Sequence, residues 1–295
     1  MVDISRCWIG KHFYGALGYA DDLTLLAPSV TGLRELLRIC EDFAAEYSVN
    51  YNAEKTVCML FSKRDIFKPS VKLCGTELKW VQSVKHLGTY LDDNMSEETE
   101  IRKKKQDLIQ RVNYIVSTLG DCDDQVVKTI FNSKCAHFYG CQSWNLTDNR
   151  VKEFQVMWNR CVRRILRLDN RTHTRFLPII LNTLTAYEQV QLRIVKLIQS
   201  MLISKNVKVN YLAKLNVKKA NSVIGANIRI ISRNIDCDVY HVISYDVTDM
   251  KKKFYSSHDE KDLRCVYQIQ ELRHSEIPGF SSDEVFSMLT FLCTE

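Results

Sequence analysis

The scarcity of glycine and proline after residue 97 is the feature that most limits what this chain can fold into. Four such residues occur between positions 97 and 235, namely Gly120, Gly140, Pro178 and Gly225. Long amphipathic runs fill the rest, and because glycine and proline weaken or end helices, the pattern predicts a mainly helical region. The run "SEETEIRKKKQDLIQRVNYIVSTL" offers Ser96 as an N-cap and acidic residues in the first turn, where the helix dipole favours them.

Before this region the chain predicts short strands around one helix, so the predicted fold class is α+β. Residues 13–19 and 23–27 are apolar runs bounded by glycine and proline, which is typical of the arms of a β-hairpin. Ser29 or Thr31 can cap a helix over residues 32–47, whose apolar stripe must pack on a sheet. Later stretches predict a strand in "TVCMLFS", a Gly-Thr turn in "VKLCGTEL", and a strand ending in an acidic turn in "SVKHLGTYLDD".

Basic charge is concentrated in the middle of the chain, although the net charge is only +6. Residues 193–233 hold nine Lys and Arg and no acid, and residues 150–175 hold eight bases against Glu153 and Asp169. Residues 236–295 reverse the balance, with six bases against 12 acids. The middle region is therefore suited to a polyanion such as nucleic acid. Solvated helix faces are the ordinary explanation of any single basic run.

The 11 cysteines are irregularly spaced and odd in number, which indicates free thiols in a reducing compartment. Their closest cluster is Cys135 and Cys141 around His137, with Cys161 and His173 further along. Because this spacing lacks the C-x-x-C pattern of zinc sites, we favour buried cysteines on helices over a metal site.

Neither a membrane span nor a signal peptide is visible. No segment reaches the roughly 18 to 20 uninterrupted apolar residues that a span requires. The start "MVDISRCWIGKHF" lacks a charged region followed by an apolar one. The expected location is intracellular, cytoplasmic or nuclear, without secretion and without a membrane partner.

Two adjacent carboxylates, Asp21 and Asp22, fall at the tip of the predicted hairpin. Aspartate is common in turns, where its side chain binds nearby backbone amides, and that explanation suffices for an isolated pair. Here, however, the string "YADDLTLLAPS" is followed by the amphipathic helix, then by "NAEKT" at residues 52–56 and "HLG" at residues 86–88. Three spaced elements in order are much harder to obtain by chance.

With these motifs the chain resembles the reverse transcriptases of LINE-type (non-LTR) retrotransposons. "YADDLTLLAPS" is similar to the catalytic motif C, "NAEKT" to motif D, and "VKHLGTYLDD" to the primer-grip motif E. The resemblance runs from about residue 9 to residue 93 and more loosely to about residue 204. It implies four segments: a partial polymerase palm of β-hairpins and a helix (1–95), a thumb-like helical region (96–175), a basic helical extension (176–235), and an acidic C-terminal segment, partly disordered (236–295).

The resemblance also implies roles for particular residues. Two Mg²⁺ ions would catalyse nucleotidyl transfer, with Asp21 as the main ligand and Asp22 as an auxiliary carboxylate. Lys55 would protonate the pyrophosphate, although a surface lysine beside Glu54 explains it equally. An RNA template and a DNA primer, or their hybrid, would be the partners. The residues that would bind nucleic acid are His86, Leu87, Gly88, Arg102, Lys103, Lys104, Lys105, Arg163, Arg164 and Arg167.

Only 18 residues precede Tyr19, and Asp3 is their only carboxylate. We therefore expect the chain to lack the first metal-binding Asp and the fingers, to bind Mg²⁺ weakly, and to be inactive as a polymerase alone. The hairpin would then expose a bare edge and an uncovered apolar face, which an N-terminal palm and fingers fragment could cover. Two other hypotheses remain open: a nucleic-acid-binding module that uses the basic helices, and an inert structural remnant.

Overall fold

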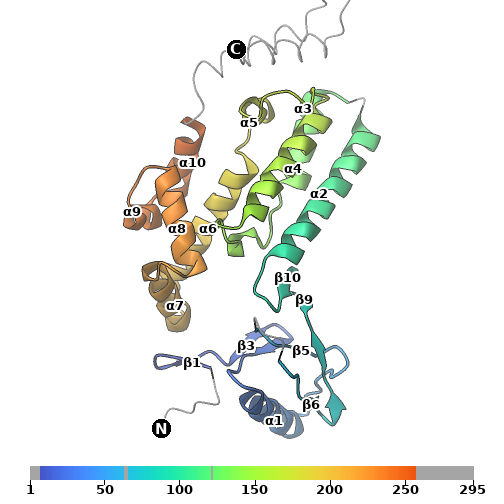
Figure 1. Cartoon of the computed structure of the whole chain (residues 1–295), viewed down its shortest axis with the longest axis vertical. Helices are drawn as coiled ribbons and strands as arrows, with labels where there is room; N and C mark the ends of the chain where they lie inside the picture. The colour runs from blue at the N-terminus through green and yellow to red at the C-terminus, as the bar shows by residue number, and fades with distance from the viewer. Residues whose placement is uncertain (1–6, 63–65, 121, 257–295) are drawn as a thin grey trace, which may run out of the picture. The chain divides into compact units, whose positions relative to one another are not determined.

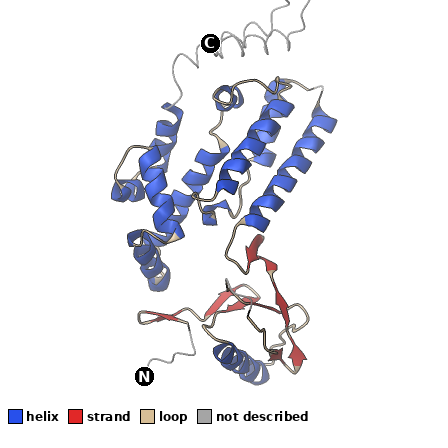
Figure 2. Cartoon of the chain, viewed as in Figure 1, coloured by secondary structure: helices blue, strands red, loops and turns tan. Residues whose placement is uncertain are grey.

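The computed structural model describes residues 7–62, 66–120 and 122–256, and these divide into two compact units. The first unit comprises Met1–His86 and Tyr90–Ser96, and the second comprises Leu87–Thr89 and Glu97–Glu295. Among the described residues, strands occur only before residue 97, and every element after it is helical (Figures 1 and 2). The α+β fold class is therefore confirmed. The finer division into four segments stays a prediction.

The strands pair two by two, and four of the five pairs join consecutive strands. In the hairpin that carries the Asp pair, Tyr19 lies opposite Asp22, and the β5–β8 pair is parallel, with Cys58 opposite Trp80. The strands are β1 (Trp8–Ile9), β2 (His12–Phe13), β3 (Ala16–Tyr19), β4 (Asp22–Leu25), β5 (Val57–Met59), β6 (Lys72–Leu73), β7 (Thr76–Glu77), β8 (Lys79–Val81), β9 (Ser83–His86) and β10 (Thr89–Asp92).

The predicted first arm, residues 13–19, is wrong as one strand, because the chain breaks at Gly15. A side chain there would lie 2.3 Å from the Phe13 ring, so glycine permits a close approach that interrupts the strand. Phe13 belongs instead to the β1–β2 hairpin, which the sequence reading missed.

The later turns also differ from those predicted. The prediction of a Gly-Thr turn is wrong. The turn residues are Cys74 and Gly75, with φ of 49° and 76°, and Thr76 already belongs to the next strand, where it pairs with Leu73. The "SVKHLGTYLDD" segment is a hairpin, β9–β10, rather than one strand. Leu87 and Gly88 form its turn with φ of 47° and 81°, the consecutive positive values typical of a tight type I′ hairpin turn.

Helix α1 (Val30–Tyr47) packs on the small core of the first unit. Ser29 is its N-cap and accepts a hydrogen bond from the Gly32 backbone N–H at 3.1 Å, so Ser29 is the cap of the two candidates. Leu37 joins the buried cluster of Cys58, Val71, Leu73 and Leu78. The end of the apolar stripe remains exposed, where the rings of Phe43 and Tyr47 stack on each other with centroids 4.5 Å apart.

The second unit is built of helices. Among them, α2 contacts α3 and α4, and α6 contacts α4 and each of α7 to α10. Ser96 is not the cap of α2, because that helix starts after Glu97, while the Ser96 backbone N–H binds Asn94 Oδ1 at 2.9 Å. Its elements are α2 (Glu98–Leu119), α3 (Asp124–Cys135), η1 (Cys141–Ser143), α4 (Asn149–Ile165), α5 (Phe176–Leu181), α6 (Ala186–Leu202), α7 (Val207–Lys218), α8 (Val223–Asn234), α9 (Val239–Ser244) and α10 (Val247–Ser256).

Aromatic rings fill the centre of this unit. Trp144 and Phe138 contact Phe154 edge to face, and Phe138 also contacts Trp158. Phe131 lies against Trp158 at 4.7 Å between centroids. This large buried cluster explains how the helical unit is stabilised by its own core.

The start of the acidic segment, for which weak patterning predicted partial disorder, contains α9 and α10. Met250 and Phe254 of α10 are buried in the same core. Residues 257–295 lie outside the described part of the chain. No helix within residues 7–62, 66–120 and 122–256 has both the length and the apolar character needed to span a bilayer.

The nine cysteines within the described residues are free, and Cys135, Cys141 and Cys161 are buried, as expected for cysteines on helices. Burial raises the pKa of Cys135 and Cys141 to about 12 and that of Cys161 to about 11. The proton therefore stays on these thiols at neutral pH.

Candidate functional site

The Asp pair lies at the tip of the β3–β4 hairpin, as the motif predicted. Ala20 and Asp21 form the two-residue turn, with Ala20 at a left-handed φ of 51°, and Asp22 is the first residue of β4. Both aspartates are exposed. Because Asp21 belongs to the turn and Asp22 to the strand, the two carboxylates are held by different local geometries.

By itself, this tip offers two carboxylates to a metal ion. A hard cation such as Mg²⁺ is held by several oxygen ligands, and a metal pair needs more carboxylates than one turn contains. Across the described residues, no group of three or more His, Cys, Asp or Glu side chains is placed to hold a metal ion. Asp21 and Asp22 therefore do not by themselves fit a pair of Mg²⁺ ions.

Apolar side chains of the same hairpin are exposed to solvent. All four residues of β3 are exposed, and β3 pairs with β4 alone among the described strands. Tyr19 is 67% exposed and Leu17 is 50% exposed, with Leu23 of β4 also exposed. The expected bare edge and uncovered apolar surface are thus present in the first unit.

Two other predicted residues of the first unit are engaged in local contacts. His86 Nε2 lies 3.2 Å from Thr24 Oγ1, which links β9 to β4, the strand that begins at Asp22. The backbone N–H of Lys55 donates to Asn52 Oδ1 at 3.1 Å, in a turn that precedes β5. No hydrogen bond or ion pair of the described residues joins Lys55 to Asp21 or Asp22.

A contact cluster in the second unit gathers around the turn residues Leu87–Thr89. The Tyr139 hydroxyl donates to the Leu87 carbonyl at 2.9 Å. Gly140, at φ 87°, lies so close that a side chain there would be 2.8 Å from Thr89 Oγ1. We call this set the turn cluster; its members are Leu87, Gly88, Thr89, Glu100, Lys104, Tyr139 and Gly140.

The turn cluster also contains a buried carboxylate beside a lysine. Glu100 is 2% exposed, and its Oε1 lies 3.5 Å from Lys104 Nζ. Lys104 Nζ lies 6.0 Å from the centre of the Tyr139 ring. Leu87, Gly88 and Lys104 are among the residues predicted to bind nucleic acid. The other four members, Thr89, Glu100, Tyr139 and Gly140, were not selected as site residues. The isolated glycine at position 140 in a glycine-poor region was the signal that marked this segment.

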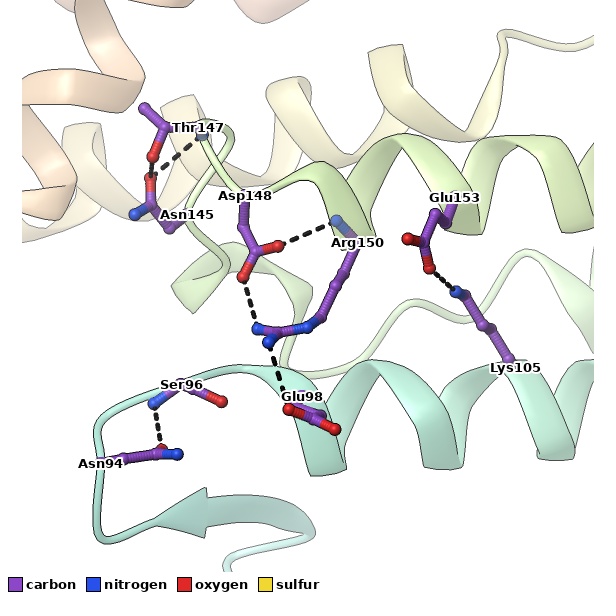
Figure 3. A network of polar contacts seen from close by, with 9 residues as sticks. All are labelled: Asn94, Ser96, Glu98, Lys105, Asn145, Thr147, Asp148, Arg150 and Glu153. Carbon is purple, nitrogen blue, oxygen red and sulfur yellow. Dashed lines mark hydrogen bonds and ion pairs between the residues drawn. The ribbon is translucent and has the colours of Figure 1, made fainter.

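Ion pairs join the basic stretch of α2 to α4 (Figure 3). Lys105 Nζ lies 2.8 Å from Glu153 Oε2, and Arg150 bridges Glu98 at 3.1 Å and Asp148 at 2.9 Å. With Lys104 paired to Glu100, two of the four predicted basic residues of α2 have acidic neighbours. Arg102 is exposed and Lys103 is half-buried.

The three predicted arginines near the end of α4 differ in what they contact. Arg163 donates from Nε and Nη2 to the Thr172 carbonyl at 3.0 and 2.7 Å, and burial, with nearby Arg160, lowers its pKa. Arg164 and Arg167 are exposed. Arg160, which the sequence reading did not select, is exposed one helical turn before Arg164. We call Arg160, Arg164 and Arg167 the α4 arginine surface.

Comparison with known proteins finds a curated relative. The chain is 27% identical over 162 residues to the "RNA-directed DNA polymerase from mobile element jockey" of Drosophila melanogaster. The match covers 50% of this chain and 17% of the relative, so the chain spans a small part of that protein. No family model matches, and no solved structure matches. The similarity supports a relationship with RNA-directed DNA polymerases of mobile elements.

Proposed function

We propose that this chain is the C-terminal part of a LINE-type reverse transcriptase, with the partial palm in the first unit and the thumb in the second. The observation that carries the proposal is the Tyr-Ala-Asp-Asp sequence at the tip of a two-residue β-hairpin turn. The ordered motifs that follow it, and the similarity to a mobile-element polymerase, support the same reading.

The role proposed for the second unit is to hold an RNA·DNA hybrid. The α4 arginine surface is exposed, and among the described residues its three members have no acidic partner. The stretch from residue 193 to 233 adds nine basic residues without an acid. Such surfaces bind the phosphate backbone without reading sequence, which suits a protein that follows a template of any sequence.

Polymerisation is proposed to require carboxylates from outside these 295 residues. Asp21 would be the main metal ligand and Asp22 the auxiliary one. Because the hairpin tip does not complete a metal pair, we assign no catalytic step to this chain alone. The exposed β3 edge is where a further palm strand, carrying the remaining ligands with the fingers, would add by backbone hydrogen bonding.

Primer extension with the purified chain tests the catalytic half of the proposal. With Mg²⁺, dNTPs and a DNA primer on an RNA template, we expect no extension, yet the hybrid should be retained in a gel-shift assay. The double variant Asp21→Asn, Asp22→Asn should retain the hybrid equally well. Robust incorporation by the chain alone would contradict the proposed inactivity.

The α4 arginine surface also suits a nucleic-acid-binding module without any link to polymerisation. Such a module would show no preference between a hybrid with a recessed primer 3′ end and a blunt one. The proposed thumb and primer-contact role requires that preference. A chain that binds neither hybrid, even at low salt, would instead be an inert structural remnant.

A further inference from the structure

The structure points to Tyr139 as a positioning residue that holds the Leu87–Gly88 turn in the conformation that contacts a primer end. This inference rests on the proposed function, which gives the turn that contact. It adds a residue that lies 52 positions further along the chain and outside the motifs.

The turn needs external support because of its backbone conformation. Leu87 adopts φ of 47° and Gly88 φ of 81°. The left-handed region is unfavourable for leucine, because its Cβ atom approaches the following carbonyl oxygen, so a contact on this residue helps to stabilise the turn. The hydrogen bond from the Tyr139 hydroxyl to the Leu87 carbonyl, at 2.9 Å, is such a contact.

The Tyr139 ring fixes the second residue of the turn. A side chain on Gly88 would lie 3.1 Å from Tyr139 Cε1, so the ring packs closely against the glycine backbone. Position 88 therefore favours glycine for two reasons, its positive φ and the space that the ring occupies. The hydroxyl and the ring of one side chain thus act on both residues of the turn.

Tyr139 is itself held by the rest of the turn cluster. Gly140 brings the backbone next to Thr89 Oγ1 and to Glu100 Oε1, which would lie 2.8 and 3.3 Å from a side chain there. Lys104 lies over the ring and beside the buried Glu100. Tyr139 remains 57% exposed and Leu87 40% exposed, so the turn is supported on one side and open to a ligand on the other.

The test compares the full chain with Tyr139→Phe, which keeps the ring and removes the hydroxyl. The matched control is Tyr114→Phe, at an exposed tyrosine on α2. Hydrogen–deuterium exchange of a peptide spanning residues 83–92 measures how stably the turn is held. Fluorescence anisotropy measures the affinity for two RNA·DNA hybrids, one with a recessed primer 3′ end and one blunt. The difference between the two affinities reports contact with the primer end.

For Tyr139→Phe we expect exchange in this peptide to rise about 3- to 10-fold, the effect of losing one hydrogen bond. Preference for the recessed end should fall by a similar factor, while affinity for the blunt hybrid is retained. Gly88→Ala should reproduce both changes, and Tyr114→Phe neither.

Exchange that stays at the wild-type rate in Tyr139→Phe would overturn the inference, because the hydroxyl would not hold the turn. Faster exchange with an unchanged preference would also overturn it, because the turn would not contact the primer end. If the wild-type chain binds neither hybrid, the proposed function fails. In that case the exchange comparison still decides whether Tyr139 holds the turn.

Discussion

At the scale of single residues, Arg163 has a structural contact where its charge suggested binding to nucleic acid. Arg163 was selected with Arg164 and Arg167 as a phosphate contact, yet two of its nitrogens donate to the Thr172 carbonyl. Sequence spacing cannot reveal that a later loop returns to this arginine. Arg160, one turn earlier, is exposed instead and is the better candidate for nucleic acid.

Asn227 gives a first prediction at this scale. Its side chain is 1% exposed, accepts from the Leu146 backbone N–H at 2.8 Å, and donates to the Trp144 carbonyl at 2.7 Å. Asn227→Ala leaves both buried backbone groups without this partner, so we expect a loss of about 2 to 4 kcal/mol in the free energy of unfolding. Urea denaturation measures it, with the exposed Asn221→Ala as control. A loss equal to that of the control would show that the two hydrogen bonds of Asn227 do not stabilise the chain.

Thiol reactivity gives a second prediction. Cys135, Cys141 and Cys161 should resist iodoacetamide at about pH 8 in the native chain, because burial raises their pKa values to about 12, 12 and 11. The exposed Cys74 and Cys122 should be labelled. Mass spectrometry of the labelled peptides reads the result. Labelling of the three buried thiols as fast as Cys74 would show that the core is open.

The same thiols determine how the stability of the folded chain changes at alkaline pH. A folded-state pKa above the unfolded value of 9.0 means that the folded chain holds these protons more tightly. Their stabilising contribution is complete below pH 9 and is lost as pH rises towards 11 and 12. We therefore expect the melting temperature of the chain to fall as the pH rises through this range. In a Cys135→Ala variant the fall, measured from that variant's own melting temperature at pH 8, should be smaller.

At the scale of elements, the sequence predicted the helices before residue 236 well and the turns poorly. Amphipathic spacing and the scarcity of glycine reflect local backbone preferences, so the helical region follows from them directly. The Leu87–Gly88 and Cys74–Gly75 turns and the break at Gly15 depend on which side chains approach the backbone, and that is decided by tertiary contacts. For the same reason the sequence placed Asp21 and Asp22 correctly at a tip but did not find Tyr139.

Helix α6 gives a prediction at this scale. Thr185 and Glu188 form a reciprocal capping box, in which the Thr185 hydroxyl accepts from the Glu188 backbone N–H at 3.2 Å and Glu188 Oε2 accepts from the Thr185 N–H at 2.8 Å. Thr185→Ala should cost about 1 kcal/mol of unfolding free energy. Urea denaturation tests this against the exposed Thr118→Ala on α2. Equal stability of the two variants would contradict a capping role.

At the scale of the whole molecule, the two units differ in how completely they bury their apolar side chains. The second unit has a large continuous core, whereas the first has a small one and leaves Leu17, Tyr19, Leu23 and Phe43 exposed. Exposed apolar side chains beside an unpaired strand edge favour association. A palm strand added at this edge, as proposed above, would cover this surface.

The chain alone should therefore self-associate through β3–β4. The double variant Leu17→Thr, Leu23→Thr keeps strand-forming residues and removes apolar surface, so light scattering should fall. Val156→Thr, at an exposed valine of α4, is the matched control. If scattering is unchanged in the β3–β4 variant, or falls as much in the control, the hairpin is not the associating surface.

Salt dependence of RNA·DNA hybrid binding tests most directly whether the second unit holds nucleic acid. We expect binding at about 50 mM salt that weakens steadily towards about 200 mM, with the logarithm of affinity linear in the logarithm of salt. Arg160→Gln with Arg164→Gln should lower the slope by about 2, one unit for each lost phosphate contact. Lys252→Gln, which removes an exposed charge on α10, should leave it unchanged. Absence of binding at low salt, or an unchanged slope in the arginine variant, would contradict the proposed interface.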